Sequence, residues 1–182
     1  MRFLRVLFLI GVIGGGQFPV GAEQSRVTEY PEVGPDVFDW SANGDEQLKA
    51  ALAEAKASGR RVVLMLGANW CVWCHRLDVI LRRDPELQAR WERDYVLVRV
   101  DVNWKSFTKR NAEILARYRR APQRGIPVIT LLNDKGSVLA NPDISRWETT
   151  EPKDYDVRKL REFFAEWAPV RSAASDRAGV KP

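Results

Sequence analysis

Cysteine, histidine and methionine are scarce: the 182-residue chain has two cysteines, one histidine and two methionines. A small domain held together by disulfides carries several well-separated cysteine pairs, whereas Cys71 and Cys74 are only three positions apart. A bridge between them would close a very short loop and add little to global stability. The scarcity excludes a disulfide-stapled scaffold and indicates a chemical role for the pair.

The apolar run at the N-terminus is too short to cross a bilayer. From Val6 to Gly16 it spans about 11 residues, against the roughly 20 that a membrane helix needs. A basic opening that includes Arg2 and Arg5 precedes it, and Val20-Gly21-Ala22 ends it. This layout predicts a secretory signal peptide over residues 1–22, cleaved after Ala22, and an exported, periplasmic protein. An uncleaved N-terminal anchor is the alternative.

Charge of one sign is not concentrated anywhere in the chain. The formal net charge of +5 falls to +3 once Arg2 and Arg5 leave with the signal peptide, and about 160 residues remain, which suits one domain. The basic residues are scattered and acids are interleaved with them, as on solvated surfaces. We therefore expect no nucleic-acid partner.

Helical and strand patterns alternate between Phe38 and Trp167, after a polar leader over residues 23–37 and before a flexible tail over 169–182. The pattern predicts one α/β domain over residues 38–168, in which a central mixed sheet has helices on both faces. Helices are expected at Gly44–Ser58, from the cysteine motif to Arg83, in a turn that Asp84 caps, at Lys109–Tyr118 and at Asp154–Trp167. Strands are expected at Arg61–Leu66, Tyr95–Val102, Val128–Leu132 and from Ser137, the last two forming a hairpin.

Cys71 is expected at the N-terminus of a helix, directly after a buried strand and a short break. Unpaired backbone N–H groups and the helix dipole favour a thiolate there, and the thiolate is the form that attacks a disulfide. Cys74 is one turn further on, close enough to attack the resulting mixed disulfide. The sequence therefore predicts that Cys71 is the nucleophile and Cys74 the resolving cysteine.

The stretch GANWCVWCHRLD, with Arg124-Gly125-Ile126-Pro127 before a later strand, resembles the thioredoxin superfamily. It is similar to exported thioredoxin-like proteins related to the C-terminal domain of the bacterial transmembrane disulfide reductase. The resemblance covers roughly Phe38 to Trp167 and implies a thioredoxin-like fold. It also implies a cis Ile126–Pro127 bond facing the cysteines, with the backbone of Ile126 pairing with an extended substrate segment.

Three residues around the cysteines are predicted to support the reaction. Trp70 and Trp73 offer an apolar platform to a partner protein, with packing against the sheet as the alternative for Trp70. His75 could favour the Cys71 thiolate or move a proton, or could be a surface residue that happens to be near. In the families that Cys-Val-Trp-Cys resembles, the central dipeptide tunes the redox potential, and Val-Trp leaves the direction of electron flow open.

One position departs from the resemblance. Thioredoxin has a buried aspartate six positions before the nucleophile, and this chain has Met65 there. Proton transfer for Cys74 must then fall to water, to His75 or to an acid supplied from elsewhere in the fold.

Two other functions stay open at the sequence level. Cys71, Cys74 and His75 also match the Cys-x-x-Cys-His pattern for covalent c-type haem, which makes an electron carrier the first alternative. The same residues could deliver Cu(I) or Zn(II), which is the second. The preferred function needs no cofactor and no metal; its partners are protein thiols and disulfides and a membrane electron donor, and we expect a monomer.

Overall fold

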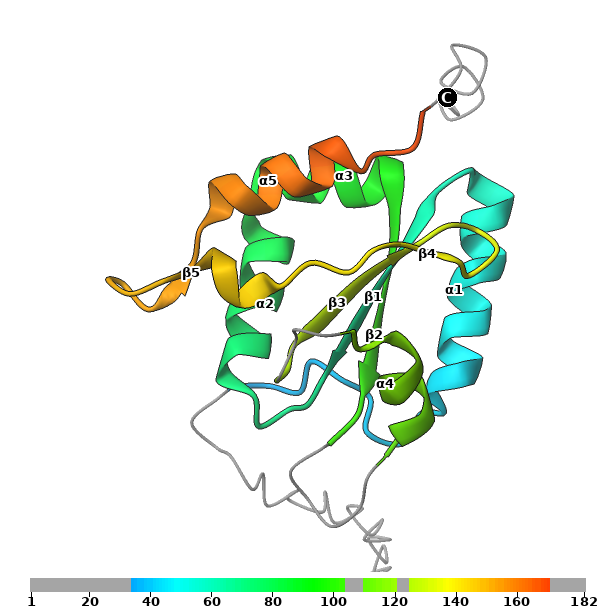
Figure 1. Ribbon diagram of the computed structural model, residues 1–182, viewed down its shortest axis with the longest axis horizontal. Coiled ribbons are helices and arrows are strands. Elements are labelled where there is room, and N and C mark those ends of the chain that lie inside the picture. Colours follow the sequence, from blue (N-terminus) through cyan, green and yellow to red (C-terminus); the bar gives the residue numbers. More distant parts are fainter. Residues whose placement is uncertain (1–33, 104–109, 121–124, 171–182) are drawn as a thin grey trace, which may run out of the picture.

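The computed structural model describes residues 34–103, 110–120 and 125–170 (Figure 1). The predicted signal peptide lies outside the described residues, as do most of the predicted leader and tail. In chain order the elements are α1 (Gly44–Ser58), β1 (Arg61–Gly67), α2 (Val72–Arg83), α3 (Pro85–Asp94), β2 (Tyr95–Asp101), α4 (Ala112–Tyr118), β3 (Val128–Leu132), β4 (Val138–Ala140), a 3₁₀ helix η1 (Ile144–Trp147), β5 (Glu148–Thr149), β6 (Asp154–Tyr155) and α5 (Val157–Glu166). No helix in these segments combines the length and the apolar character needed to cross a membrane.

Four strands form the main sheet, in the order β2-β1-β3-β4. β1 is parallel to β2 and antiparallel to β3, so that Leu64 is paired with Val98 on one side and with Thr130 on the other. β3 and β4 form an antiparallel hairpin, with β4 at the edge of the sheet. β5 pairs with β6 in a separate two-stranded sheet. The main sheet is mixed, as the sequence predicts.

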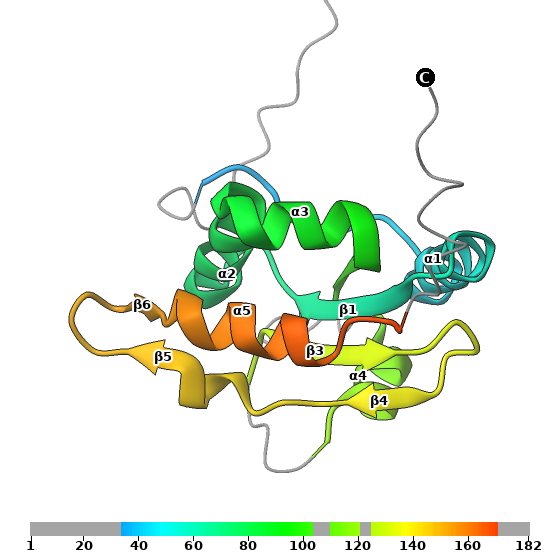
Figure 2. The same ribbon diagram turned by 90° about the horizontal axis from the view of Figure 1, so that it is seen from above.

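β1 is buried on both faces because its side chains alternate between two hydrophobic clusters. Val63 and Met65 belong to the cluster that also holds both cysteines and residues of α2, α3 and α5. Val62 and Leu64 belong to the cluster beneath α1 and α4. Figures 1 and 2 show the sheet between these two groups of helices. The predicted fold class, a mixed sheet with helices on both faces, is confirmed.

Helix ends follow the capping residues and the backbone beside them, and two of the predicted helix starts are corrected. α1 begins after Asn43, whose side chain accepts from Asp45 and Glu46 N–H, and stops at Gly59, which has a φ of 67°. The last helix does not start at Asp154, as predicted, because Asp156 caps it and residues 154–155 form strand β6 instead. α4 begins at Ala112, because Asn111 before it has a left-handed φ of 49°; the predicted start, Lys109, lies outside the described residues.

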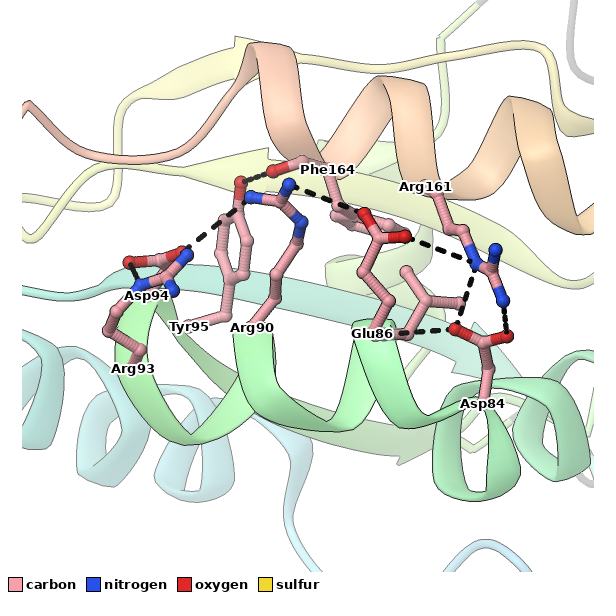
Figure 3. Close-up of polar contacts among 9 residues, drawn as sticks. Asp84, Glu86, Arg90, Arg93, Asp94, Tyr95, Arg161 and Phe164 are labelled. Carbon is pink, nitrogen blue, oxygen red and sulfur yellow. Dashed lines mark hydrogen bonds and ion pairs between the residues drawn. The ribbon is translucent and has the colours of Figure 1, made fainter.

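Charged side chains join α3 to α5 across the surface of the fold (Figure 3). Asp84 caps α3 by accepting from Leu87 N–H at 3.0 Å, and its two carboxylate oxygens accept from Nε and Nη2 of Arg161 on α5. Arg161 also lies 3.5 Å from Glu86. Nearby, the Tyr95 hydroxyl donates to the Phe164 carbonyl oxygen at 2.8 Å. These contacts fix α5 over α3 and the start of β2.

We expect Asp84→Ala to lower the free energy of unfolding by about 1–2 kcal/mol, because it removes a helix cap. The hydrogen bond from Arg161 also lowers the pKa of the Asp84 carboxyl below its ordinary value of 3.8. A carboxyl with a depressed folded pKa stabilises the fold above its unfolded pKa, and that contribution is lost as the pH falls through the folded pKa. Urea unfolding at pH 7 and through a series down to pH 3 measures both effects.

Asp84→Asn is the matched control, since the amide oxygen still caps α3 while the charge is gone. Its deficit relative to the native chain should be present above about pH 4 and should shrink below that pH. A deficit that stays constant with pH would show that the ion pair with Arg161 contributes nothing.

Candidate active site

Cys71 and Cys74 lie at the N-terminus of α2 and form a disulfide, with Cα atoms 5.2 Å apart. Cys71 is the N-cap residue, and its Sγ accepts a hydrogen bond from the backbone N–H of Cys74 at 3.1 Å. When the bond is reduced, the same N–H and the positive end of the helix favour a thiolate at Cys71. Cys74 is fully buried and Cys71 is 5% exposed. The geometry gives the two sulfurs unequal surroundings, as the sequence predicts.

The segment Ile126–Pro127 faces the pair from a distant part of the chain. Its peptide bond is cis, which confirms the prediction. The Ile126 carbonyl oxygen lies 3.5 Å from Cys71 Sγ, and Val128 then begins β3 beside β1. The fold thus brings together the two motifs on which the sequence prediction depends.

Asn69, which the sequence analysis did not single out, fixes the loop that leads into Cys71. Its side-chain oxygen accepts from the backbone N–H groups of Val37 and Phe38 at 3.0 and 2.9 Å, and its side-chain amide donates to the Phe38 carbonyl at 3.0 Å. His75 Nε2 lies 2.8 Å from the Asn69 carbonyl oxygen, so this nitrogen is the donor. The His75 ring therefore holds the loop at Asn69 against the first turn of α2. A proton-transfer role for His75 stays a prediction.

Gly67, the last residue of β1, makes room for two neighbouring side chains. A Cβ atom there would lie 2.3 Å from a ring carbon of Phe38 and 2.9 Å from Cys74 Sγ. Both distances are shorter than real Cβ contacts, so only glycine fits without movement. Phe38 is 2% exposed, and its ring lies in the same cluster as Cys74. The segment around Phe38 therefore helps to bury the resolving cysteine.

The two predicted tryptophans are half-buried and held by the fold. The Trp70 ring nitrogen donates to the Asn103 side chain at 3.0 Å. The Trp73 ring stacks edge-on against Tyr155 of β6, with centroids 5.2 Å apart, and the Arg76 guanidinium lies 4.9 Å from its centroid. Of the pair between the cysteines, Val72 is the exposed residue. That Trp70 and Trp73 form an apolar platform for a partner protein stays a prediction.

Met65 is fully buried in the cluster of the cysteines, so no acid occupies the position where thioredoxin has one. Two buried carboxylates lie on neighbouring elements. Asp78 of α2 pairs with Arg82 and Arg99, both at 2.6 Å. Asp101, at the end of β2, pairs with Arg110 at 3.0 Å. Burial raises the pKa of Asp101 above its ordinary value of 3.8, against the hydrogen bond from Arg110 that lowers it.

The arrangement does not resemble a metal site. Within residues 34–103, 110–120 and 125–170, no three histidine, cysteine or acidic side chains lie close enough together to hold an ion. The His75 Nε2 atom, one of the two ring nitrogens that could bind a metal or a haem iron, is engaged with the Asn69 carbonyl. The side chains present fit exchange of thiols and disulfides better than ligation.

A helix that begins at a Cys-x-x-Cys disulfide, a buried strand before it and a cis-proline facing it define a thioredoxin-type redox protein. The family model described as "Thioredoxin-like" matches residues 39–134, and the chain belongs to that family. This result confirms the resemblance on which the sequence analysis drew.

Curated relatives of the chain are named as thiol:disulfide interchange proteins. The chain is 28% identical over 106 residues to the thiol:disulfide interchange protein DsbD of Vibrio cholerae, and 39% identical over 72 residues to DsbD 1 of Pseudomonas aeruginosa. These alignments cover 58% and 40% of this chain but only 17% and 12% of the relatives. A crystal structure described as a disulphide isomerase from Xylella fastidiosa is 28% identical, with a TM-score of 0.58 over 72% of this chain and 96% of that one.

Proposed function

We propose that the chain is a thiol–disulfide oxidoreductase that exchanges the Cys71–Cys74 disulfide with thiols and disulfides of other proteins in the periplasm. The observation that carries the proposal is the position of Cys71 Sγ, at the N-terminus of α2 and 3.5 Å from the Ile126 carbonyl oxygen. A nucleophilic sulfur there lies beside backbone that can pair with an extended substrate segment.

The chemistry follows from the unequal surroundings of the two sulfurs. In the reducing direction, the Cys71 thiolate attacks a substrate disulfide, a new Cys71–substrate bond forms, and the other substrate sulfur leaves as a thiolate. Cys74 then loses its proton and attacks Cys71 Sγ, which re-forms the internal disulfide and releases the second substrate thiol. In the oxidising direction the same steps run in reverse. The potentials of the partners decide which direction prevails.

The partners and the compartment are part of the proposal. The relatives named as thiol:disulfide interchange proteins support protein thiols and disulfides as substrates. The resemblance of the cysteine motif to the bacterial transmembrane disulfide reductase supports a membrane electron donor as the source of reducing equivalents. The signal-peptide pattern of residues 1–22 supports export to the periplasm. We propose that the chain acts as a monomer.

Equilibration with thiol redox buffers tests the proposed function. The purified chain is incubated in mixtures of reduced and oxidised dithiothreitol or glutathione, quenched with acid and alkylated, and its free thiols are counted by mass spectrometry. We expect both cysteines to become alkylated together, reversibly, in a single two-electron transition. A pair that does not cycle would leave the chain without the proposed activity.

A further inference from the structure

The proton acceptor that thioredoxin-type chemistry needs is missing from β1, where Met65 stands, but the adjacent strand β2 supplies a carboxylate. Gly67 and Asp101 are the paired last residues of the parallel strands β1 and β2. Paired residues of neighbouring strands project to the same face, with Cβ positions about 5 Å apart. The side chain of Asp101 therefore starts beside the space at Gly67 that the Phe38 ring and Cys74 Sγ share, 2.3 Å and 2.9 Å from where a Cβ atom would lie.

Alternation along β2 places Asp101 on the cysteine side of the sheet. Val96, Val98, Val100 and Val102 face the cluster beneath α1 and α4. Tyr95 and Leu97 face the cluster of the cysteines, and Arg99 reaches Asp78 on α2. Asp101 continues this second series, and it is 1% exposed.

We propose that Asp101 is the residue that takes the proton from Cys74 when the mixed disulfide is resolved. The Cys74 S–H bond breaks and the proton passes to the Asp101 carboxylate, directly or through one water. The Cys74 thiolate then bonds to Cys71 Sγ, and the electron pair of the Cys71–substrate bond leaves with the substrate sulfur. The Asp101 carboxyl returns its proton to that thiolate or to solvent. This inference rests on the proposed function.

The charges around Asp101 suit a group that must both gain and lose a proton. Arg110, which precedes α4, donates to it, and Asp36 of the N-terminal segment opposes its ionisation. On α2, the buried acid Asp78 is paired with two arginines. Gly67 on β1 brings no charge. Burial and Asp36 raise the pKa of Asp101, while Arg110 limits the rise.

Stopped-flow reaction of the reduced chain with 5,5′-dithiobis(2-nitrobenzoate) tests the proposal. Attack by Cys71 releases one thionitrobenzoate, and attack by Cys74 on the mixed disulfide releases a second, so the two steps give separate absorbance phases. Because thionitrobenzoate leaves readily, the second phase reports the deprotonation of Cys74. We expect Asp101→Asn to leave the first phase unchanged and to slow the second about 100-fold at neutral pH, as for loss of a positioned base.

The pH profile separates a proton acceptor from a merely structural residue. In the native chain the rate constant of the second phase should become independent of pH once Asp101 is ionised. In Asp101→Asn the rate constant of the second phase should rise about tenfold per pH unit until the Cys74 thiol itself ionises. Arg110→Gln keeps the Asp101 carboxyl and removes the positive charge beside it. The rising part of the pH profile of the second phase should therefore move to higher pH. That variant also tests the proposal should Asp101→Asn fail to fold.

Two further variants complete the design. Asp94→Asn is the matched control, because Asp94 is 2% exposed, pairs with arginines and immediately precedes the opposite end of β2. It should leave both phases unchanged. Asp78→Asn tests the other buried acid on this face. A normal second phase in Asp101→Asn, or a slow second phase in Asp78→Asn alone, would overturn the proposal. Loss of the first phase in the native chain would instead contradict the proposed function.

Discussion

Cells that produce the Cys74→Ser variant should accumulate mixed disulfides between Cys71 and partner proteins. Removing Cys74 leaves the first attack intact, because Cys71 remains at the helix N-terminus, but it removes the thiol that would release the partner. Catalytic turnover should fall to background. The adducts appear as high-mass bands on non-reducing gels of acid-trapped extracts and vanish on reduction.

Cys71→Ser is the control for this experiment, since it keeps one cysteine and the same helix. It should trap almost no partner, because the remaining sulfur of Cys74 is fully buried in the cluster that also holds Phe38. Equal trapping by the two variants would contradict the assigned roles of the cysteines. Mass spectrometry of the Cys74→Ser adducts also identifies the substrates.

The second large effect is expected for Gly67→Ala, which adds one methyl group beside the resolving cysteine. The new Cβ would meet the Phe38 ring at 2.3 Å and Cys74 Sγ at 2.9 Å, and one side chain or the end of β1 must move. Overpacking of a buried site costs about 1–3 kcal/mol, and we expect a loss near the upper end. For a domain of this size the melting temperature should fall by about 5–10 °C. Thermal unfolding followed by circular dichroism measures the loss.

Gly125→Ala provides the comparison, because a Cβ at Gly125 meets no atom within 4 Å. Its melting temperature should equal that of the native chain. The double variant Gly67→Ala with Phe38→Leu should lose less stability than the two single changes added together, since the smaller side chain leaves the space that the methyl group needs. Additive losses would show that the Phe38 ring is not what excludes a side chain at Gly67.

The sequence predicts those parts of the fold that short-range patterns specify. α1 and β3 have their predicted bounds, because α1 combines helix-forming residues with a terminating Gly59 and β3 is a short apolar run that precedes a turn. The sheet of β5 and β6 was missed, since strands of two residues have no periodicity to detect. The predicted helix start at Asp154 was wrong because Asp156, two positions later, makes an equally good cap.

The candidate site also has residues that local sequence patterns predict and residues that they do not. Cys71, Cys74 and Pro127 belong to local motifs, so their positions could be predicted. The contacts of Asn69 with Val37 and Phe38 span more than thirty residues, and the stacking of Trp73 on Tyr155 spans still more, so no local signal reveals them. Asn69 is a polar residue between a buried strand and the cysteines, and that position is a sequence feature that could have drawn attention.

The central claim is that Cys71 and Cys74 form a redox-active pair rather than a structural bridge, and the midpoint potential of the redox-buffer titration tests it most directly. Thioredoxin-type centres have potentials between about −270 and −120 mV, whereas structural disulfides lie below about −300 mV. We predict a reversible two-electron transition inside the first range, in which both thiols appear together. A midpoint below about −300 mV, or a pair that fails to re-form after reduction, would contradict the account.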